Sequence, residues 1–310
     1  MRGTVEVPER YISTPREKAM SGEGPTAGAP PGHAHGPASG GPARGPRGLL
    51  QRMDKGQIGH IVAVGSGKGG VGKSSVAALL ASELRRRGRT VGILDADITG
   101  PSIPKLLGVT GPLVDRGEGI EPATTRGGVP VVSSQFMVED EQTPVIWRGP
   151  LVTRLITQFF GSVHWGKLDY LIIDMPPGTS DVPLTVFQTI PIDGMVFVLT
   201  PQELAALIVT KAMNMARDLH VPLLGVVENM ASVACPRCGE HVDLFGPSHV
   251  GKVAAEYGIP VLGRLPVTPG VSELSDAGRL DEHTSPEVAG LGVAFEKAVD
   301  DATKGSMTVL

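Results

Sequence analysis

The segment from residue 65 to residue 74 carries the residue types that bind phosphate. From Gly67 to Ser74 it reads GKGGVGKS, which fits the pattern G-x-x-x-x-G-K-[ST]. Glycines let the backbone turn tightly and aim successive N–H groups at phosphate oxygens. In such a loop Lys73 reaches the β- and γ-phosphates of a nucleotide, and the hydroxyl of Ser74 binds Mg²⁺. The segment therefore predicts a site for a nucleoside triphosphate and Mg²⁺.

A glycine-rich turn can match this pattern by chance, so its context matters. A short apolar run over residues 60–64 precedes the loop, and a helical pattern over residues 75–87 follows it. That helix begins near Lys73 and adds its positive dipole end to the phosphate site. The residues that we expect to contact the nucleotide here are Gly67, Lys68, Gly69, Gly70, Val71, Gly72, Lys73, Ser74 and Ser75.

Three aspartates lie at the ends of predicted strands. Asp95 and Asp97 close the run that begins at Val91, and Asp174 closes the run that begins at Leu168. The carboxyl ends of parallel strands are where ligands bind in open α/β sheets. A Mg²⁺–water shell and an attacking water both need carboxylates there. The alternative role for each aspartate is that of a helix N-cap.

The only two cysteines of the chain form a C-x-x-C pair, Cys235 and Cys238, flanked by Pro236 and Gly239. Zn²⁺ or a [4Fe–4S] cluster usually takes four protein ligands, so one chain supplies too few thiolates and a two-fold dimer supplies enough. Three readings remain open: a transferable iron–sulfur cluster, a zinc site, and a dithiol switch or inert pair. The zinc site would use four cysteines across a dimer, or would be completed by His241 or His249. The flanking Pro and Gly favour an exposed turn.

Strands and helices alternate from residue 59 onward, which predicts an α/β fold with a mostly parallel sheet covered by helices on both faces. We expect one domain over residues 58–300, and a flexible C-terminus over 301–310. Residues 1–57 are rich in Gly, Pro and Ala, so we expect a disordered tail. The expected strands are 60–64, 91–95, 129–132, 168–174, 194–200 and 223–228, and further helices are expected over 151–160 and 203–219.

Composition and charge argue against some classes of function. The chain is 41% hydrophobic and 19% charged with a net charge of −4, so no basic surface for nucleic acid or anionic membrane is indicated. No apolar run approaches the ~18–20 residues that span a bilayer, and the first residues lack the apolar core of a signal peptide. We therefore expect a cytoplasmic protein that binds neither membrane nor nucleic acid.

The string from Lys68 to Ser74 resembles the "deviant" Walker A family, which includes Mrp/ApbC, MinD, ParA and nitrogenase iron protein. This resemblance implies a P-loop NTPase in which Lys68 reaches across a dimer to the other subunit's phosphates. A second ammonium there neutralises developing charge, the role that an arginine finger has elsewhere. The alternative for Lys68 is a solvated lysine on the loop.

Further motifs are similar to the Mrp/ApbC (Nbp35-like) branch. They are DADI at 95–98, GPSIP at 100–104, WRGP at 147–150, DMPPGT at 174–179, VENM at 227–230 and LGRLP at 262–266. The resemblance implies that Asp97 orients the attacking water, beside Lys68 and Lys73, while Asp95 lies nearer the metal shell. It also implies that Asp174 reaches Mg²⁺ through water, that the Gly178 N–H senses the γ-phosphate, and that Asn229 contacts adenine.

Such relatives are homodimeric ATPases that hold a [4Fe–4S] cluster between subunits and pass it to apo-proteins. The resemblance thus implies ATP hydrolysis, with Cys235 and Cys238 as cluster ligands and with scaffold and client proteins as partners. Residues 245–249, FGPSH, depart from the glycine-rich stretch usual after the cysteines. The main rival is a spatial-organisation ATPase similar to MinD or ParA with a structural zinc knuckle. A redox protein similar to nitrogenase iron protein is less consistent, because its two cysteines lie far apart in sequence.

Overall fold

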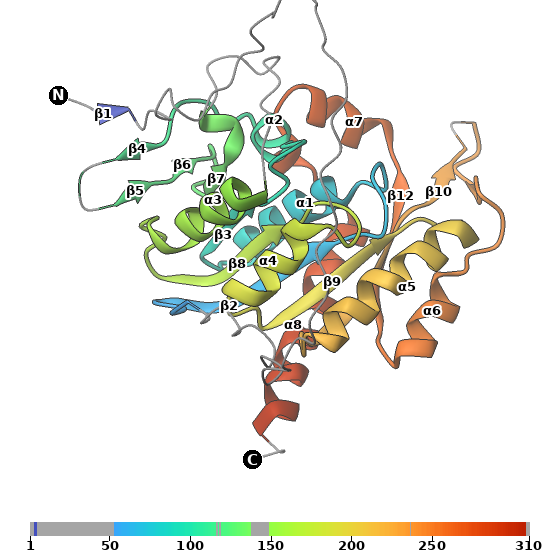
Figure 1. Ribbon diagram of the computed structural model, residues 1–310. Helices are drawn as coiled ribbons and strands as arrows, with labels where there is room; N and C mark the ends of the chain where they lie inside the picture. The colour runs from blue at the N-terminus through green and yellow to red at the C-terminus, as the bar shows by residue number, and fades with distance from the viewer. Residues whose placement is uncertain are drawn as a thin grey trace, which may run out of the picture. The chain divides into compact units, whose positions relative to one another are not determined.

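The structure of the protein, a computed structural model, describes residues 3–4, 53–115, 117, 119–137, 149–235 and 237–307 (Figure 1). Most of the tail expected over residues 1–57 therefore lies outside the described residues, and so do Trp147 and Arg148 of the motif at 147–150. No helix within the described residues is long and apolar enough to cross a membrane.

The described strands form two sheets. In chain order the strands are β1 (Gly3–Thr4), β2 (Ile58–Gly65), β3 (Val91–Asp95), β4 (Val114–Asp115), β5 (Ile120–Glu121), β6 (Ala123–Thr124), β7 (Pro130–Ser133), β8 (Leu168–Asp174), β9 (Gly194–Leu199), β10 (Leu223–Ala234), β11 (His241–Val242) and β12 (Val261–Val267). The order in the large sheet is β11-β10-β9-β2-β8-β3-β7-β6, and β12 also pairs with β10. A small antiparallel sheet has the order β1-β4-β5.

The large sheet is parallel except at its two ends, where β6 and β11 pair in antiparallel fashion with β7 and β10. Its central strands are short apolar runs, buried on both faces, as parallel strands in α/β proteins are. The strands expected over 91–95 and 168–174 form at those bounds, and the predicted α/β fold is confirmed.

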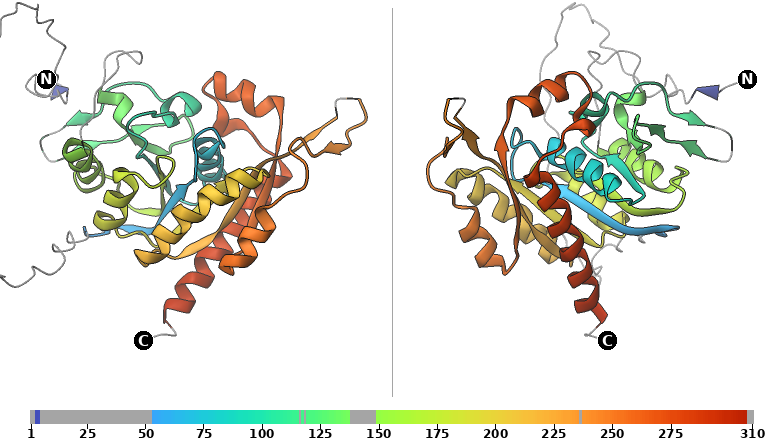
Figure 2. Two further views of the ribbon diagram at one scale, coloured as in Figure 1. Left: turned by 45° about the vertical axis from the view of Figure 1, so that its right-hand side comes forward. Right: turned by 180° about the vertical axis from the view of Figure 1, so that it is seen from behind.

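Helices cover both faces of the large sheet (Figures 1 and 2). The helices are α1 (Lys73–Arg86), α2 (Ile103–Leu107), α3 (Gly149–Gly161), α4 (Asp181–Thr189), α5 (Glu203–Asp218), α6 (Val250–Tyr257), α7 (Pro269–Asp276) and α8 (Pro286–Met307), with 3-10 turns η2 (Ser134–Met137) and η3 (Leu280–Glu282). Buried side chains of α3, α4, α5 and α6 form the core on one face. Those of α1, α2 and α8 form the core on the other.

Described residues on either side of the expected range 58–300 also contact the domain. Met53 packs against the first of these cores, and its N–H donates to the carbonyl of Thr189. Lys55 pairs with Asp193 at 2.6 Å. At the other end, α8 continues to Met307, and its apolar side chains as far as the buried Val299 and the partly buried Ala302 pack in the second core. The expected flexible C-terminus over 301–310 is therefore helical as far as residue 307.

Strand register brings the predicted carboxylates together. Asp174 at the end of β8 lies opposite Asp95 at the end of β3, and opposite Val64 near the end of β2. The loop that follows β2 therefore starts beside both aspartates. Parallel pairing aligns all three carboxyl ends at one edge of the sheet, which is where ligands bind in such folds.

Candidate nucleotide site and cysteine hairpin

The phosphate loop lies between β2 and α1, as the sequence predicted. Helix α1 begins at Lys73, and its N-cap Gly72 has a left-handed φ of 79°. No described side chain caps the first turn of this helix. Its N–H groups therefore stay open toward the loop, and together with the helix dipole they suit an anion.

Close packing fixes the shape of this loop. A Cβ on Gly67 would lie 2.5 Å from the backbone nitrogen of Val209 in α5, so only glycine fits there. A Cβ on Gly72 would collide with the side-chain amide of Asn229. That amide donates to the carbonyl of Val71 at 2.9 Å, so β10 supports the loop directly.

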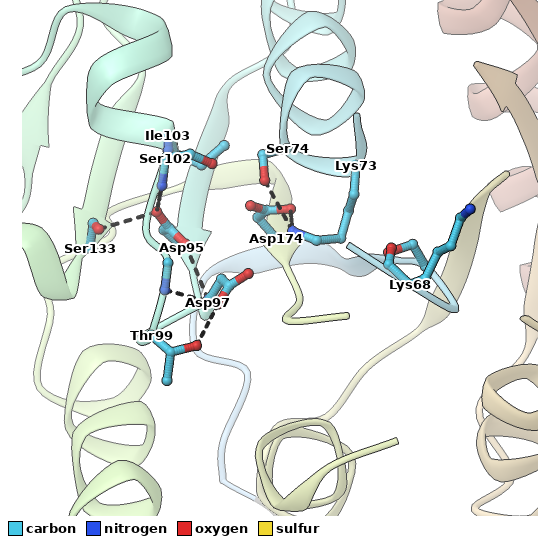
Figure 3. A network of polar contacts seen from close by, with 12 residues as sticks. Lys68, Lys73, Ser74, Asp95, Asp97, Thr99, Ser102, Ile103, Ser133 and Asp174 are labelled. Atoms are coloured by element: carbon cyan, nitrogen blue, oxygen red, sulfur yellow. Dashed lines mark hydrogen bonds and ion pairs between the residues drawn. The ribbon is translucent and has the colours of Figure 1, made fainter. Parts of the chain in front are cut away.

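A buried ion pair joins the loop to β8. The Nζ of Lys73 lies 2.5 Å from Oδ1 of Asp174 and 3.0 Å from Oγ of Ser74 (Figure 3). Lys73 is 6% exposed and Asp174 is fully buried. The second carboxylate oxygen of Asp174, Oδ2, is buried and has no hydrogen-bond partner. An orphaned carboxylate oxygen beside the Ser74 hydroxyl fits Mg²⁺, which prefers oxygen ligands and keeps much of its water shell.

The electrostatics of the site also favour a cation. Burial raises the pKa of Asp174, and the charge of Lys73 acts against that rise. Burial and then the charge of Asp174 raise the pKa of Asp95 to about 8. Two carboxylates in register with one lysine leave the site short of positive charge, which a divalent cation would supply.

Asp95 anchors the surrounding loops. Its Oδ2 accepts hydrogen bonds from the N–H groups of Ser102 and Ile103, at 3.2 and 3.3 Å, and from the Ser133 hydroxyl at 3.2 Å. These bonds hold the start of α2 and the end of β7 against β3. The predicted place of Asp95 in the metal shell stays a prediction, since its contacts in this structure are with protein donors.

Asp97 is partly exposed on the loop after β3. Its Oδ1 accepts from the Thr99 hydroxyl and the Gly100 N–H, each at 3.2 Å. In Figure 3 it lies beside Asp95, on the side of the site that carries Asp174. This position leaves the proposed water-orienting role of Asp97 open as a prediction.

Lys68 points away from Lys73 and Asp174 (Figure 3). Its Nζ donates to the side-chain carbonyl of Gln202 at 3.3 Å, at the N-cap of α5. The structure therefore does not bring Lys68 into the cluster formed by Lys73, Ser74 and Asp174. A lysine aimed away from its own site suits a role at the site of another subunit, which remains a prediction.

The loop after β8 is tied to the phosphate loop. The N–H of Gly178, the predicted γ-phosphate sensor, donates to the carbonyl of Ser66 at 2.9 Å. The hydroxyl of Ser66 in turn donates to the carbonyl of Lys68 at 3.0 Å. Sensing a γ-phosphate through the Gly178 N–H would require that the bond to Ser66 breaks.

Strand β10 connects the nucleotide site to the cysteines. It continues to Ala234, well beyond the predicted end at residue 228, and Cys235 follows it directly. Asn229, in the same strand, holds the phosphate loop. Between them, Met230 has a left-handed φ of 57°, and the pairing with β12 shifts register between Asn229 and Val233. A non-glycine residue rarely adopts this conformation, and such strain is common at functional sites.

The cysteines occupy the turn of the hairpin between β10 and β11. The N–H of Cys235 donates to the carbonyl of Glu240, and the N–H of Gly239 donates to the carbonyl of Cys235, both at 2.8 Å. Backbone N–H groups of Arg237 and Cys238, and then the Cys238 thiol, hydrogen-bond to the Cys235 sulfur and hold the pKa of its thiol below the ordinary value. Both thiols are free, and Cys238 is exposed as predicted. This turn stabilises the Cys235 thiolate beside the exposed Cys238, where a partner can reach both side chains.

Within the described residues, no three His, Cys, Asp or Glu side chains are grouped so that they could hold a metal ion. His241 is instead hydrogen-bonded through Nδ1 to the Ser232 hydroxyl at 2.8 Å. The structure therefore does not form the zinc site that His241 or His249 would complete within one chain. This finding does not bear on a metal site or cluster that two chains would share through their cysteines.

The ParA family model, described as "NUBPL iron-transfer P-loop NTPase", matches residues 57–300 of this chain. The chain belongs to this family. The relatives of this P-loop NTPase include two proteins named "Iron-sulfur cluster carrier protein". The one from Methanocaldococcus jannaschii is 47% identical over 73% of this chain and 79% of its own length. The one from Aquifex aeolicus is 43% identical over 80% and 69%.

Solved structures agree with the fold of this P-loop NTPase. A nucleotide-binding protein from Archaeoglobus fulgidus, solved in complex with ADP, is 46% identical and has a TM-score of 0.67. The match covers 75% of this chain and 91% of that protein. The cell division ATPase MinD of Pyrococcus furiosus has a TM-score of 0.55 at 23% identity, so it supports the fold alone.

Some site residues were not predicted from the sequence. Ser66, Gln202 and Met230 contact the phosphate loop or connect it to the hairpin, and none of them carries a recognisable motif. Only the place of Ser66 inside the glycine-rich segment could have pointed to it. The other two depend on the strand order, in which β9 lies beside β2 and β10 lies beside β9.

Proposed function

We propose that this chain is an ATP-dependent iron–sulfur cluster carrier, which hydrolyses ATP and delivers a [4Fe–4S] cluster to apo-proteins. Two copies would hold the cargo cluster between them through Cys235 and Cys238 of each. The partners would be a scaffold protein that supplies the cluster and client proteins that receive it. We place the carrier in the cytoplasm, away from membrane and nucleic acid.

The observation that carries this proposal is the cysteine turn. Cys238 is exposed, and the backbone donors around Cys235 favour its thiolate, the form that ligates iron. A site for permanent structural metal is usually closed by its own chain, whereas this turn offers two thiolates only. An open half-site suits a cluster that is assembled between subunits and later released. The names of the relatives point to the same activity.

The nucleotide half of the proposal rests on Lys73, Ser74 and Asp174. Lys73 would leave Asp174 for the phosphates of ATP, and Ser74 and Asp174 would then hold Mg²⁺, Asp174 through water. When bound, Mg²⁺ neutralises charge on the β- and γ-phosphates. Asp97 would orient the water that attacks the γ-phosphorus as the bond to the β–γ bridging oxygen breaks. Lys68 of the second copy would stabilise the charge that develops in that step.

Strand β10 connects the proposed ATP site to the cysteines. In this strand, the side chain of Asn229 hydrogen-bonds to the phosphate loop, and the last residue, Ala234, directly precedes Cys235. A rearrangement of the loop around ATP would therefore move the strand that carries the cluster ligands. A spatial-organisation ATPase with a zinc knuckle would not need such a connection. The net charge of −4 also does not favour binding to an anionic membrane or to DNA.

Anaerobic reconstitution with iron and sulfide, followed by transfer to an apo-acceptor, tests this function. We expect the wild type to gain a broad visible absorption band and to activate the acceptor, at a rate that changes when MgATP is present. The Cys235→Ser/Cys238→Ser variant should lose the band, and Lys73→Ala should keep the band but lose the effect of ATP. Zinc in place of iron in the wild type, or a band that persists in the cysteine variant, would contradict the proposal.

A further inference from the structure

A cavity of about 100 Å³ lies beside the last turns of α1. Its walls also include Ile93 of β3, Leu107 of α2, the turn between β6 and β7, and Asp281 of η3. Helix α1 has 14 residues, so at ~1.5 Å per residue its last turn lies about 20 Å from the phosphate loop. The cavity has room for one small ion or molecule. None of its lining residues belongs to the nucleotide site or to the cysteine hairpin.

Two guanidinium groups line this cavity, those of Arg85 and Arg86. Arg85 donates through Nε to the carbonyl of Gly127 at 3.2 Å, which is the one hydrogen bond of this guanidinium group among the described residues. Arg86 donates through Nε to Glu83 at 3.0 Å and through a terminal amino group to the carbonyl of Asp281 at 2.9 Å. Both arginines therefore keep terminal N–H donors for a ligand, in the fork geometry that suits phosphate oxygens.

Asp281, which also lines the cavity, has a carboxylate oxygen that lacks a donor. Its Oδ1 is buried and has no hydrogen-bond partner among the described residues. A Cβ on Gly127 would lie 3.7 Å from Oδ2 of the same carboxylate, so the turn between β6 and β7 packs close to it. Basic residues in the last turn of a helix ordinarily offset its dipole, which accounts for the arginines but not for this oxygen. A ligand that donates a hydrogen bond would account for it.

The charges around the cavity favour an anion. Burial, and then the charge of Arg86, lowers the pKa of His283, so this side chain is neutral at neutral pH. In the segments 82–86, 125–129 and 279–283, which surround the cavity, arginines outnumber carboxylates by four to three: Arg85, Arg86, Arg126 and Arg279 against Glu83, Asp281 and Glu282. An anion that carries a hydrogen-bond donor would match both the arginines and the orphaned oxygen.

We propose that this cavity binds a phosphate group accompanied by a hydroxyl, with Arg85 and Arg86 on its anionic oxygens and with Oδ1 of Asp281 accepting from the hydroxyl. Inorganic phosphate carries such a hydroxyl on phosphorus at neutral pH, and a small phosphomonoester carries one on its carbon chain. Sulfate has a similar shape but no proton, so one of its oxygens would face the Asp281 oxygen with acceptor against acceptor. This ligand site is additional to the proposed function and does not depend on it.

Calorimetric titration of the full-length protein with inorganic phosphate, and separately with sulfate, tests the cavity. The phosphate loop is first filled with Mg²⁺ and a non-hydrolysable ATP analogue, so that binding there is not counted. Arg85→Gln removes one guanidinium group from the cavity. Arg87→Gln is the matched control, because Arg87 lies at the same end of α1 but pairs with Glu296. Arg85 is exposed, so the fold should survive, and thermal unfolding will verify that it does.

We expect the wild type and Arg87→Gln to bind phosphate about tenfold or more tightly than sulfate, and Arg85→Gln to bind phosphate about tenfold or more weakly than the wild type. Asp281→Asn places an amide N–H donor where the acceptor was, so sulfate should bind this variant about as tightly as phosphate does. A merely structural role of Asp281 would not change the preference between the two anions.

Three results would overturn the inference: no binding of phosphate at about 10 mM, equal affinities for phosphate and sulfate in the wild type, or an unchanged phosphate affinity in Arg85→Gln. A preference for phosphate that persists in Asp281→Asn would overturn it too. Glycerol 3-phosphate distinguishes the two sources of the phosphate group. Tighter binding than that of inorganic phosphate identifies a phosphomonoester as the ligand, and weaker binding identifies the free ion.

Discussion

The ammonium of Lys73 and the carboxylate of Asp174 form a buried ion pair, 2.5 Å from Nζ to Oδ1. The loop lysine is thus already inside the site, held by the carboxylate that is expected to face Mg²⁺ through water. Nucleotide binding would exchange this partner for phosphate and free Asp174 for the cation. A pair of this kind keeps the site preorganised while no nucleotide is bound.

Replacing Asp174 by Asn should weaken the use of Mg²⁺ more than the binding of nucleotide. An amide cannot supply the negative charge that orients the water shell of the metal, so we expect the Mg²⁺ concentration for half-maximal ATPase activity to rise about 10–100-fold. The measurement is a Mg²⁺ titration of ATP hydrolysis. Asp169→Asn is the control, because Asp169 lies in the same strand but bonds Thr90. An unchanged Mg²⁺ dependence in Asp174→Asn would exclude Asp174 from the metal shell.

Lys68 should act on the nucleotide of the other subunit. We expect Lys68→Ala and Asp97→Asn each to bind ATP with little change in affinity and to lose hydrolysis, whereas Lys73→Ala should lose nucleotide binding itself. Mixing the two inactive variants provides the test. Heterodimers would contain one site with an intact Asp97 and the partner's Lys68, so ATPase activity should return to about a quarter of the wild-type value. A mixture as inactive as its parents would mean that Lys68 acts within its own chain.

Asn229→Ala should weaken nucleotide binding, because it removes the hydrogen bond to the Val71 carbonyl that shapes the phosphate loop. A neutral hydrogen bond of this kind corresponds to roughly a 2–10-fold change in dissociation constant. Titration with ATP and with GTP separates two roles. Equal weakening indicates support of the loop alone, and a larger loss for ATP indicates contact with adenine. Asn214→Ala is the control, since Asn214 of α5 accepts a hydrogen bond from the Tyr257 hydroxyl of α6. Full ATP affinity in Asn229→Ala would refute both roles.

Glu296 should contribute stability that depends on pH. Burial acts to raise its pKa, but hydrogen bonds from Arg89 and Arg87 outweigh this and hold the pKa below the ordinary value of 4.5. Its contribution is therefore present above the unfolded-state pKa and is lost as pH falls through the folded-state pKa. Both arginines remain partly exposed, so we expect Glu296→Gln to cost about 1 kcal/mol at neutral pH.

Urea unfolding of the wild type and Glu296→Gln, measured from neutral pH into the acid range, checks this prediction. The difference in the free energy of unfolding should shrink toward zero as pH falls through the folded-state pKa of Glu296, because the carboxyl group is then protonated in both states. A difference that stays constant from neutral pH to acid would show that the two arginines do not stabilise the folded carboxylate.

The parts of the site that follow from local pattern were predictable. The loop Gly67–Ser74 and the start of α1 at Lys73 depend on glycine flexibility and helix periodicity, which the sequence displays directly. The strands ending at Asp95 and Asp174 are apolar runs bounded by turns, and parallel pairing then brings their carboxylates to one edge. These inferences need only neighbours along the chain and the general rule for α/β sheets.

Contacts between distant segments were not predictable in the same way. The bonds of Asn229 to Val71, of Lys68 to Gln202 and of Gly178 to Ser66 all depend on the order of strands in the sheet, which periodicity does not specify. The extension of β10 to Ala234 was missed as well. The polar residues Glu228 and Asn229 interrupt its apolar run, while pairing with β11 and β12 continues the strand beyond them.

Native mass spectrometry of the full-length chain, reconstituted anaerobically with iron and sulfide, tests most directly whether a cluster is held between two copies. We expect a species with the mass of two chains and one [4Fe–4S] cluster, which is absent from the Cys235→Ser/Cys238→Ser variant. A cluster or a zinc ion retained on a single chain would contradict the shared site.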